Sequence, residues 1–338
     1  MKLLLPIAAM AATALARTEI MVPLHAAPGN DKMSPQWQAV VDAAVAHPDM
    51  HFYVVVNPNS GPQNTSFDTG NCSPKGVDYI PHGCNKDWST NVGRLNNVPN
   101  IQTLGYVYAR YGHEEQRNRT AVEVDIQEWA DWNSERDWFG NAANISIHGI
   151  WFDETGVQKG NASEFQELTD FARRVFNAKP NRGLFDIVMN PGSNPDQNYE
   201  QTLFNMADAV VTRETCWTST PDAVECNGTY YPYNWTDLRC GNGTPYDPAL
   251  NSKAVVVVHE FHDPPTANTA TLLEQIRGTV RQGLHSAFFT SGSYANTTIE
   301  PASLGNVAEF FSLANNETTV PMPNPCPRPQ AKGSSLTH

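Results

Sequence analysis

Eight short apolar runs recur along the chain with helical patterns between them, and this repetition limits the fold more than any other feature of the sequence. Several runs, such as Val255 to Val258, are hydrophobic without interruption, which is typical of parallel strands covered on both faces. Helical periodicity appears at residues 34–45, 122–130, 163–176 and 272–284. The expected strands are residues 20–25, 52–57, 103–109, 148–154, 185–190, 209–214, 254–260 and 286–290.

Strands that alternate with helices in this way predict a parallel sheet. Eight of them favour a closed (β/α)8 TIM barrel, an α/β fold, over an open sheet. We expect one barrel domain over residues 17–320. The Pro- and Ser-rich residues 321–338 are expected to form a C-terminal tail.

The first residues predict a secretory signal peptide. Lys2 supplies a positive charge, residues 3–10 are largely apolar, and Ala14-Leu15-Ala16 is a small-x-small cleavage site. We therefore assign residues 1–16 to targeting and expect a secreted protein, extracellular or at the cell surface. No other apolar run is long enough to cross a bilayer, so we expect no membrane span.

Six cysteines and ten N-x-[ST] sequons fit a secretory route. Cys72 and Cys84 are close enough to pair locally, while the other four cysteines can pair in three ways. The two long connections, residues 58–91 and 215–253, each follow an expected strand and hold most of the cysteines. We therefore expect enlarged, disulfide-bearing loops on the C-terminal face of the barrel, where barrel enzymes place their active sites.

The charge of the chain argues against a nucleic-acid partner. Its 35 acidic residues outnumber its 22 Lys and Arg, for a net charge of −13 at pH 7. Phosphate binding needs clustered basic residues, and the sequence has no basic patch. A monomer is the default expectation.

Carboxylates at the ends of two alternate strands are the strongest candidates for catalysis. Asp153 and Glu154 end the fourth expected strand, and Glu214 ends the sixth. Strands of the same parity contribute to a common layer in the barrel, so Glu214 can face Asp153 or Glu154 across a sugar. Glycosidases need such a pair of carboxyl groups. Because side chains alternate along a strand, only one of Asp153 and Glu154 is expected to enter the barrel, and the sequence leaves open which one.

Polar and aromatic residues at the other strand ends are candidates for substrate binding. Amide, hydroxyl and charged groups can hydrogen-bond sugar hydroxyls, and aromatic faces can stack on a sugar ring. For any single aromatic residue, ordinary packing is the competing interpretation. The candidates are Asn57, Asn59, Tyr106, Tyr108, Arg110, Trp151, Asn190, Trp217 and His259.

No metal or cofactor is expected. The segment from His259 to Asp263 does not match H-E-x-x-H, and strand alternation places His259 and His262 on opposite faces. Ser291-Gly292-Ser293 is not a nucleophile elbow, and the sequence has no glycine loop suited to phosphate.

Five segments together resemble the spherulin-4-like family, which corresponds to glycoside hydrolase family 135. They are V-P-L at residues 22–24 with P-G at 28–29, V-N-P-N-S-G-P at 56–62, L-G-Y-V at 104–107, G-I-W-F-D-E at 149–154 and M-N-P-G at 189–192. The matches run in order over nearly the whole chain after the signal peptide. The N-P-N-S-G-P and F-D-E segments together are specific, while either alone is weak.

This resemblance implies a (β/α)8 barrel with endo-α-1,4-N-acetylgalactosaminidase activity on galactosaminogalactan, a fungal exopolysaccharide. The family's acidic residues map onto Asp153 and Glu154 through F-D-E, and onto Glu214 through the sixth strand. The chain departs from the family at His25, where an aromatic residue is expected, at the bulky Trp151, and in enlarged loops at residues 62–89 and 215–250. These departures lie near the expected cleft and bear on the substrate more than on the reaction.

The hypothesis is hydrolysis within an α-linked amino-sugar polysaccharide, which would be the partner of this protein. Glu214 is assigned as general acid/base. Asp153 is assigned as nucleophile, or as the group that orients a 2-acetamido substituent, and Glu154 stands in reserve for either role. Two alternatives remain open: a cell-surface protein that binds glycan without cutting it, and a metal-dependent deacetylase that uses the region around His259.

Overall fold

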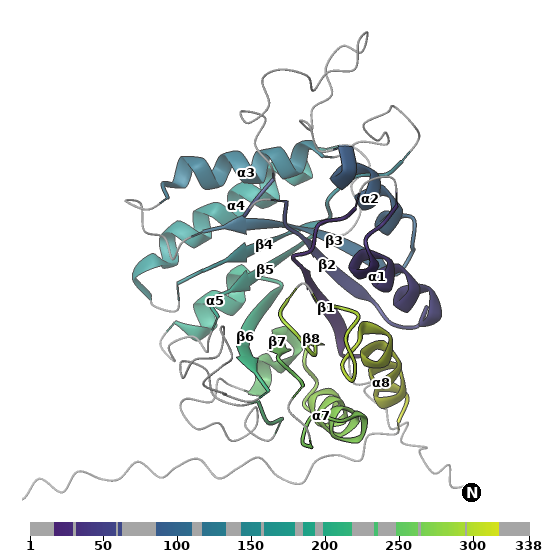
Figure 1. Cartoon of the computed structure of the whole chain (residues 1–338). Coiled ribbons are helices and arrows are strands. Elements are labelled where there is room, and N and C mark those ends of the chain that lie inside the picture. Colours follow the sequence, from purple (N-terminus) through teal and green to yellow (C-terminus); the bar gives the residue numbers. More distant parts are fainter. Residues whose placement is uncertain are drawn as a thin grey trace, which may run out of the picture.

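The protein, described here from a computed structural model, is a closed barrel of eight parallel strands in chain order, β1 to β8 (Figure 1). The predicted (β/α)8 fold is therefore confirmed. The structure describes residues 17–29, 32–58, 60–62, 86–109, 117–132, 143–156, 159–179, 185–192, 199–217, 233–235, 248–262, 265–294 and 296–317. The predicted signal peptide and tail lie outside these residues.

Every strand lies where an apolar run predicts it, and the ends differ by at most two residues. Each strand pairs with the next one in the sequence, and β8 pairs with β1 to close the barrel. The strands are β1 Glu19–Leu24, β2 Phe52–Val56, β3 Ile101–Tyr108, β4 Gly149–Asp153, β5 Asp186–Asn190, β6 Ala209–Cys216, β7 Ala254–His259 and β8 Ser286–Phe289.

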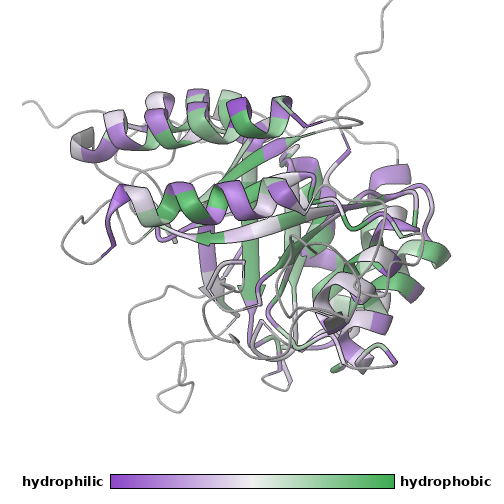
Figure 2. Cartoon of the chain, turned by 90° about the horizontal axis from the view of Figure 1, so that it is seen from above, coloured by the Kyte–Doolittle hydropathy of each residue, from purple (hydrophilic) through white to green (hydrophobic). Residues whose placement is uncertain are grey.

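Helices surround the strands and bury their apolar sides against them. Figure 2 shows the mixed hydrophilic and hydrophobic stripes of these helices around mostly hydrophobic strands. The four helices expected from periodicity are present, and α2, α5 and α8 are additional. The helices are α1 Pro35–Ala46, α2 Lys86–Asn96, α3 Arg119–Asp131, α4 Ala162–Asn177, α5 Glu200–Met206, α7 Thr269–Arg281 and α8 Leu304–Asn316, with the 3-10 helices η3 Lys159–Asn161 and η4 Pro248–Lys253.

The connection from β6 to β7 differs from the others. Within its described residues, the only helical element is η4, and residues 233–235 pack against α7. The Tyr233 hydroxyl lies 2.7 Å from the Thr279 hydroxyl. Trp235 covers Gly278, where an added Cβ would lie 2.2 Å from the indole. These two aromatic residues of the long connection therefore have a structural role.

A β-bulge interrupts β6 and decides which of its side chains enter the barrel. Val211 pairs with Val255, but Arg213 pairs with Val256, so Thr212 is an extra residue. Registered residues of neighbouring parallel strands face the same side, and side chains alternate along a strand. The extra residue therefore turns Glu214 inward. In a regular strand that kept Thr212 in the pairing, Arg213 would lie opposite Val257 and point into the barrel.

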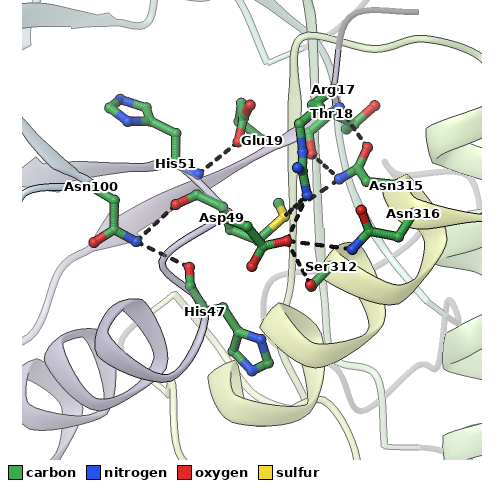
Figure 3. Close-up of polar contacts among 11 residues, drawn as sticks. Arg17, Thr18, Glu19, His47, Asp49, His51, Asn100, Ser312, Asn315 and Asn316 are labelled. Carbon is green, nitrogen blue, oxygen red and sulfur yellow. Dashed lines mark hydrogen bonds and ion pairs between the residues drawn. The ribbon is translucent and has the colours of Figure 1, made fainter.

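A polar seam ties the chain before β1 to α8 at the amino end of the barrel (Figure 3). The Asn315 amide bonds both backbone groups of Thr18, accepting from its N–H at 3.0 Å and donating to its carbonyl at 2.9 Å. Asp49 accepts hydrogen bonds from Arg17 and Ser312. The backbone N–H of His51 donates to Glu19 at 2.7 Å. The seam holds β1, β2 and the last turn of α8 together.

The sequons that the structure describes are accessible, as expected for glycan acceptors. Four of these asparagines are exposed and two are half-buried. The exposed ones are Asn118, Asn144, Asn234 and Asn316, and the half-buried ones are Asn161 and Asn296.

Five of the six cysteines lie outside the described residues, so the predicted pairings stay predictions. Cys216 is buried at the end of β6 and is disulfide-bonded. It therefore belongs to β6, whereas the sequence assigned it to the connection over residues 215–253. Among the described residues, no helix is both long enough and apolar enough to cross a membrane.

Candidate active site

Unusual backbone conformations gather at the carboxyl ends of the strands. Among the described residues, the non-glycine residues with positive φ are Ser60, Glu154 and Glu260, which follow β2, β4 and β7. Such conformations cost free energy and persist where the surrounding structure enforces them, often at functional sites. This end of the barrel is also where the predicted acidic residues lie.

Asp153 is the member of the F-D-E pair that enters the barrel. Tyr106 donates its hydroxyl hydrogen to one carboxylate oxygen, and Asn190 donates to the other at 2.7 Å. The Trp151 side chain and the backbone N–H of Glu154 also hydrogen-bond to it. Burial raises the pKa of Asp153, and these four hydrogen bonds act in the opposite direction.

The position of Tyr106 depends on the glycine before it. An added Cβ on Gly105 would lie 2.5 Å from the Trp129 ring of α3. The close approach lets the Trp129 indole N–H donate to the Tyr106 carbonyl at 2.8 Å. The L-G-Y-V segment thus fixes the strand that carries the Tyr106 hydroxyl to Asp153.

Asn190 of β5 joins the carboxylates of β4 and β6. Its Nδ2 donates to Asp153 at 2.7 Å and to Oε2 of Glu214 at 2.8 Å. Its Oδ1 accepts the backbone N–H of Gly192 at 2.9 Å, which orients the amide. Gly192 has a φ of +70°, a conformation that favours glycine. Since one nitrogen contacts both, the two carboxylate oxygens are no more than about 5.5 Å apart.

Tyr294, in the segment after β8, completes this arrangement and was missed at the sequence level. Its hydroxyl donates to Oε1 of Glu214 and lies 3.3 Å from Nε2 of His259. The rule that identified aromatic residues at other strand ends would have found it. That rule predicted Tyr106 and Tyr108 of β3, but for the segment after β8 the sequence analysis considered only whether Ser291-Gly292-Ser293 forms a nucleophile elbow.

Two imidazoles flank Tyr294. The ring centroids of His259 and His25 lie 4.9 and 5.7 Å from its ring, and His25 also contacts Tyr106 at 5.5 Å. Burial lowers the pKa of each of these histidines to about 4. Both rings are therefore neutral at neutral pH, and His25 lies between the two tyrosines that bond the two carboxylates.

The predicted site residues divide between an inner group and a rim. Asn190, Trp151 and His259 are nearly inaccessible, with 5%, 2% and 1% of their surface exposed. They support other site residues, and their predicted contact with sugar stays a prediction. Glu154 is half-buried and lies on the strained turn after β4.

Three other candidates lie at the rim. Oδ1 of Asn57 is buried without a hydrogen-bond partner among the described residues. Tyr108 is half-buried, with the Arg117 guanidinium 6.0 Å from its ring centre. Trp217 is half-buried and stacks on Phe261 at 4.6 Å. Asn59 and Arg110 lie outside the described residues.

A metal centre has no support within the described part of the chain. No group of three or more His, Cys, Asp or Glu side chains there is arranged to hold a metal ion. His262 instead forms an ion pair with Glu260 at 2.7 Å. The site offers two carboxylates, hydroxyl and amide donors and neutral imidazoles, which suit proton transfer and nucleophilic attack.

Comparisons with known proteins identify the family and the fold of the chain. A sequence model described as spherulation-specific family 4 matches residues 19–307. Spherulin-4 of Physarum polycephalum is 25% identical over 188 residues, which cover 56% of this chain and 43% of that protein. The matched region thus spans less than half of that relative's length.

A solved structure shares the architecture. The crystal structure of Aspergillus clavatus Sph3 in complex with GalNAc superposes with a TM-score of 0.58 at 24% sequence identity. The alignment covers 89% of this chain and 98% of the Sph3 chain. At this level of identity the likeness demonstrates the barrel fold.

Proposed function

The chain belongs to the spherulation-specific family 4, and from this premise we propose that it is a glycoside hydrolase acting within an α-linked N-acetylgalactosamine polysaccharide. The observation that carries the proposal is the pair Asp153 and Glu214, held by one amide nitrogen at the carboxyl end of a barrel. Two carboxyl groups facing one another across a sugar are the minimum apparatus of most glycosidases. The GalNAc bound to the Sph3 structure supports the choice of sugar.

The separation of the carboxylates favours a retaining reaction. Retaining enzymes hold their carboxyl groups about 5–5.5 Å apart, while inverting enzymes leave about 6.5–9.5 Å for a water molecule. The oxygens that contact Asn190 are within about 5.5 Å of one another. We therefore propose a double displacement through a covalent glycosyl-enzyme intermediate.

In the first step, an Asp153 oxygen attacks the anomeric carbon while Glu214 gives its proton to the departing glycosidic oxygen. Burial raises the pKa of Asp153, and four hydrogen bonds from Tyr106, Asn190, Trp151 and the Glu154 backbone oppose this shift in favour of the ionised form that attack requires. In the second step, the Glu214 carboxylate takes a proton from water, and the resulting hydroxide displaces Asp153. Glu154 is assigned to the rim, where it can bind substrate.

The cellular setting is part of the proposal. A signal peptide at residues 1–16, disulfides in the long loops and glycans on the exposed sequons would suit an enzyme that meets its polymer outside the cell. The net charge of −13 favours a partly deacetylated, cationic polymer. No cofactor is required, and a monomer suffices, because all the named groups come from one chain.

The test is incubation of purified protein with α-1,4-linked N-acetylgalactosamine polymer, with mass spectrometry of released oligosaccharides and proton NMR of the new reducing ends. Oligomers that first appear with the α configuration are expected. Glu214→Gln should abolish release, whereas Glu19→Gln, the same change at the opposite end of the barrel, should preserve it. Binding without release by the wild type would refute the proposal and favour a glycan-binding protein.

A further inference from the structure

Both oxygens of the Glu214 carboxyl are held by donors that come from other strands. Oε2 accepts from Asn190 after β5, and Oε1 accepts from Tyr294 after β8. Asn190 also donates to Asp153, so its hydrogen bonds stabilise the negative charge of both carboxylates. Tyr294 donates its hydroxyl hydrogen to Glu214, whereas the tyrosine that donates to Asp153 is Tyr106.

The direction of the hydrogen bonds behind Tyr294 follows from the number of available protons. A tyrosine hydroxyl has one hydrogen, and this hydrogen points to Glu214. The 3.3 Å contact with His259 then requires Nε2 of the imidazole to donate to the hydroxyl oxygen. A neutral His259 can do so in the Nε2–H tautomer. The chain therefore runs from imidazole to hydroxyl to carboxylate, and each bond polarises the next.

The tyrosine ring is held in place as firmly as its hydroxyl. His259 and His25 contact it at centroid distances of 4.9 and 5.7 Å. His259 is 1% exposed and lies against the sulfur of Cys216 at 3.7 Å. Cys216 and His259 are registered partners on β6 and β7. The support for Tyr294 thus extends to the strand that carries Glu214.

We propose that Tyr294, backed by His259, is a positioning residue that orients the Glu214 carboxyl and stabilises its negative charge. The inference rests on the proposed function for its catalytic meaning, but the hydrogen-bond chain itself does not depend on the substrate. As Glu214 alternates between acid and base, the Tyr294 hydroxyl would hold the carboxylate in the interval when its proton is on the leaving sugar.

The titratable groups around Glu214 come from four other elements. Asp153 ends β4 and shares Asn190 with it, His259 ends β7, Tyr294 follows β8, and His25 follows β1. Both histidines are neutral above pH 6 because burial lowers their pKa to about 4. Neither imidazole therefore contributes a charge that varies between pH 6 and pH 8.

The first experiment is the pH profile of kcat/KM for Tyr294→Phe. A general acid must be protonated, so its pKa sets the alkaline limb. Loss of a donor to the carboxylate raises that pKa, and the alkaline limb should move up by about one pH unit. Tyr106→Phe is the matched variant, because it removes the corresponding hydroxyl donor to Asp153. It should move the acidic limb up and leave the alkaline limb in place.

Replacement of His259 tests the support behind the tyrosine. His259→Phe removes the donor to the Tyr294 hydroxyl, and the alkaline limb should move in the same direction by less than for Tyr294→Phe. His259→Gln keeps a side-chain N–H and should restore the wild-type limb. If the alkaline limb of the kcat/KM profile had the same position in His259→Phe and His259→Gln, a role of the imidazole hydrogen bond would be contradicted.

A second measurement needs no activity. A donor to a carboxylate contributes stability above the unfolded-state pKa of Glu, and this contribution is lost as the pH falls through the folded-state pKa. The Tm difference between wild type and Tyr294→Phe should therefore widen from pH 4 to pH 7, by about 2–4 °C. Tyr233→Phe is the control, since its hydroxyl bonds the neutral Thr279, and its Tm difference should not vary with pH.

The outcomes separate this inference from the proposed function. An inactive wild type would refute the function, while the Tm series would still decide the role of Tyr294. An unmoved alkaline limb, or a Tm difference for Tyr294→Phe as constant as that for Tyr233→Phe, would overturn the positioning role. A moved acidic limb would overturn it as well, because Glu214 would then act in its ionised form as nucleophile.

Discussion

The two ends of the barrel both carry carboxylates in the lumen, but the carboxylates have different hydrogen-bond donors at the two ends. At the amino end, Glu19 accepts a backbone N–H from His51, and Asp186 accepts from Gln102 at 2.6 Å. At the carboxyl end, Asp153 and Glu214 share one donor nitrogen. Burial raises the pKa of Glu19, Asp186 and Asp153 alike.

A buried carboxyl group with a raised pKa therefore does not by itself identify an active site. Glu19 and Asp186 have separate partners, and Glu19 belongs to the polar seam before β1 (Figure 3). Asp153 and Glu214 converge on one donor, Asn190, and are flanked by strained backbone at Glu154. A donor shared by two carboxylates at the carboxyl ends of the strands distinguishes the candidate active site from the amino end of the barrel.

Matched Asp→Asn substitutions at the two ends should separate them most clearly. Asp153→Asn removes the proposed nucleophile and should lower kcat/KM by about three orders of magnitude or more, with little change in Tm. Asp186→Asn keeps the shape of the side chain at the other end and should leave kcat/KM within about twofold. Comparable losses of activity in the two variants would mean that the ends do not differ as described.

Much of this arrangement follows from the sequence. Apolar runs such as Val255 to Val258 can be buried only in a covered strand, and their number and spacing predict the barrel. Strand-end position then identifies Asp153 and Glu214. The additional helix α5 has only seven residues, too few for a periodic pattern to stand out.

The contacts between strands could not be predicted in the same way. Sequence spacing does not say that Asn190 bridges two carboxylates, or that His259 and Trp151 turn inward. Those positions depend on register, and the register of β6 changes at Thr212. Strand alternation also could not choose between Asp153 and Glu154, because the positive φ of Glu154 ends the alternation there.

Acidification should reduce the stability of the fold through the buried histidines at the amino end of the barrel. Burial lowers the pKa of His285 to about 4 and also lowers the pKa of His51 and His148. Below pH 6.5 these histidines bind protons in the unfolded chain but remain neutral in the folded chain. The free energy of unfolding therefore falls as the pH decreases. The raised pKa values of Glu19 and Asp186 act in the opposite direction at lower pH.

His285→Gln isolates one contribution. Between pH 7 and pH 5, it should lose about 2 kcal/mol less unfolding free energy than the wild type. Denaturant unfolding at several pH values measures this difference. Parallel pH dependences for the two proteins would show that His285 titrates normally in the folded state.

The smallest expected effect concerns the seam itself. Asn315→Leu leaves both backbone groups of the fully buried Thr18 without their partner and should cost about 1–2 kcal/mol of stability. Ser312→Ala removes an exposed contact to Asp49 and should cost less than about 0.5 kcal/mol. Activity at room temperature should survive both changes, and a loss of activity would link the seam to the site.

The bulge at Thr212 places Val211 and Glu214, three residues apart, on the same lumenal side of β6. Removal of the codon for Thr212 would restore regular alternation and leave Glu214 opposite Val257, facing the lumen. The number of residues before the carboxylate can therefore change by one while its position in the barrel does not. In an alignment of relatives, a one-residue gap within the sixth strand would not by itself mean that this carboxylate has left the site.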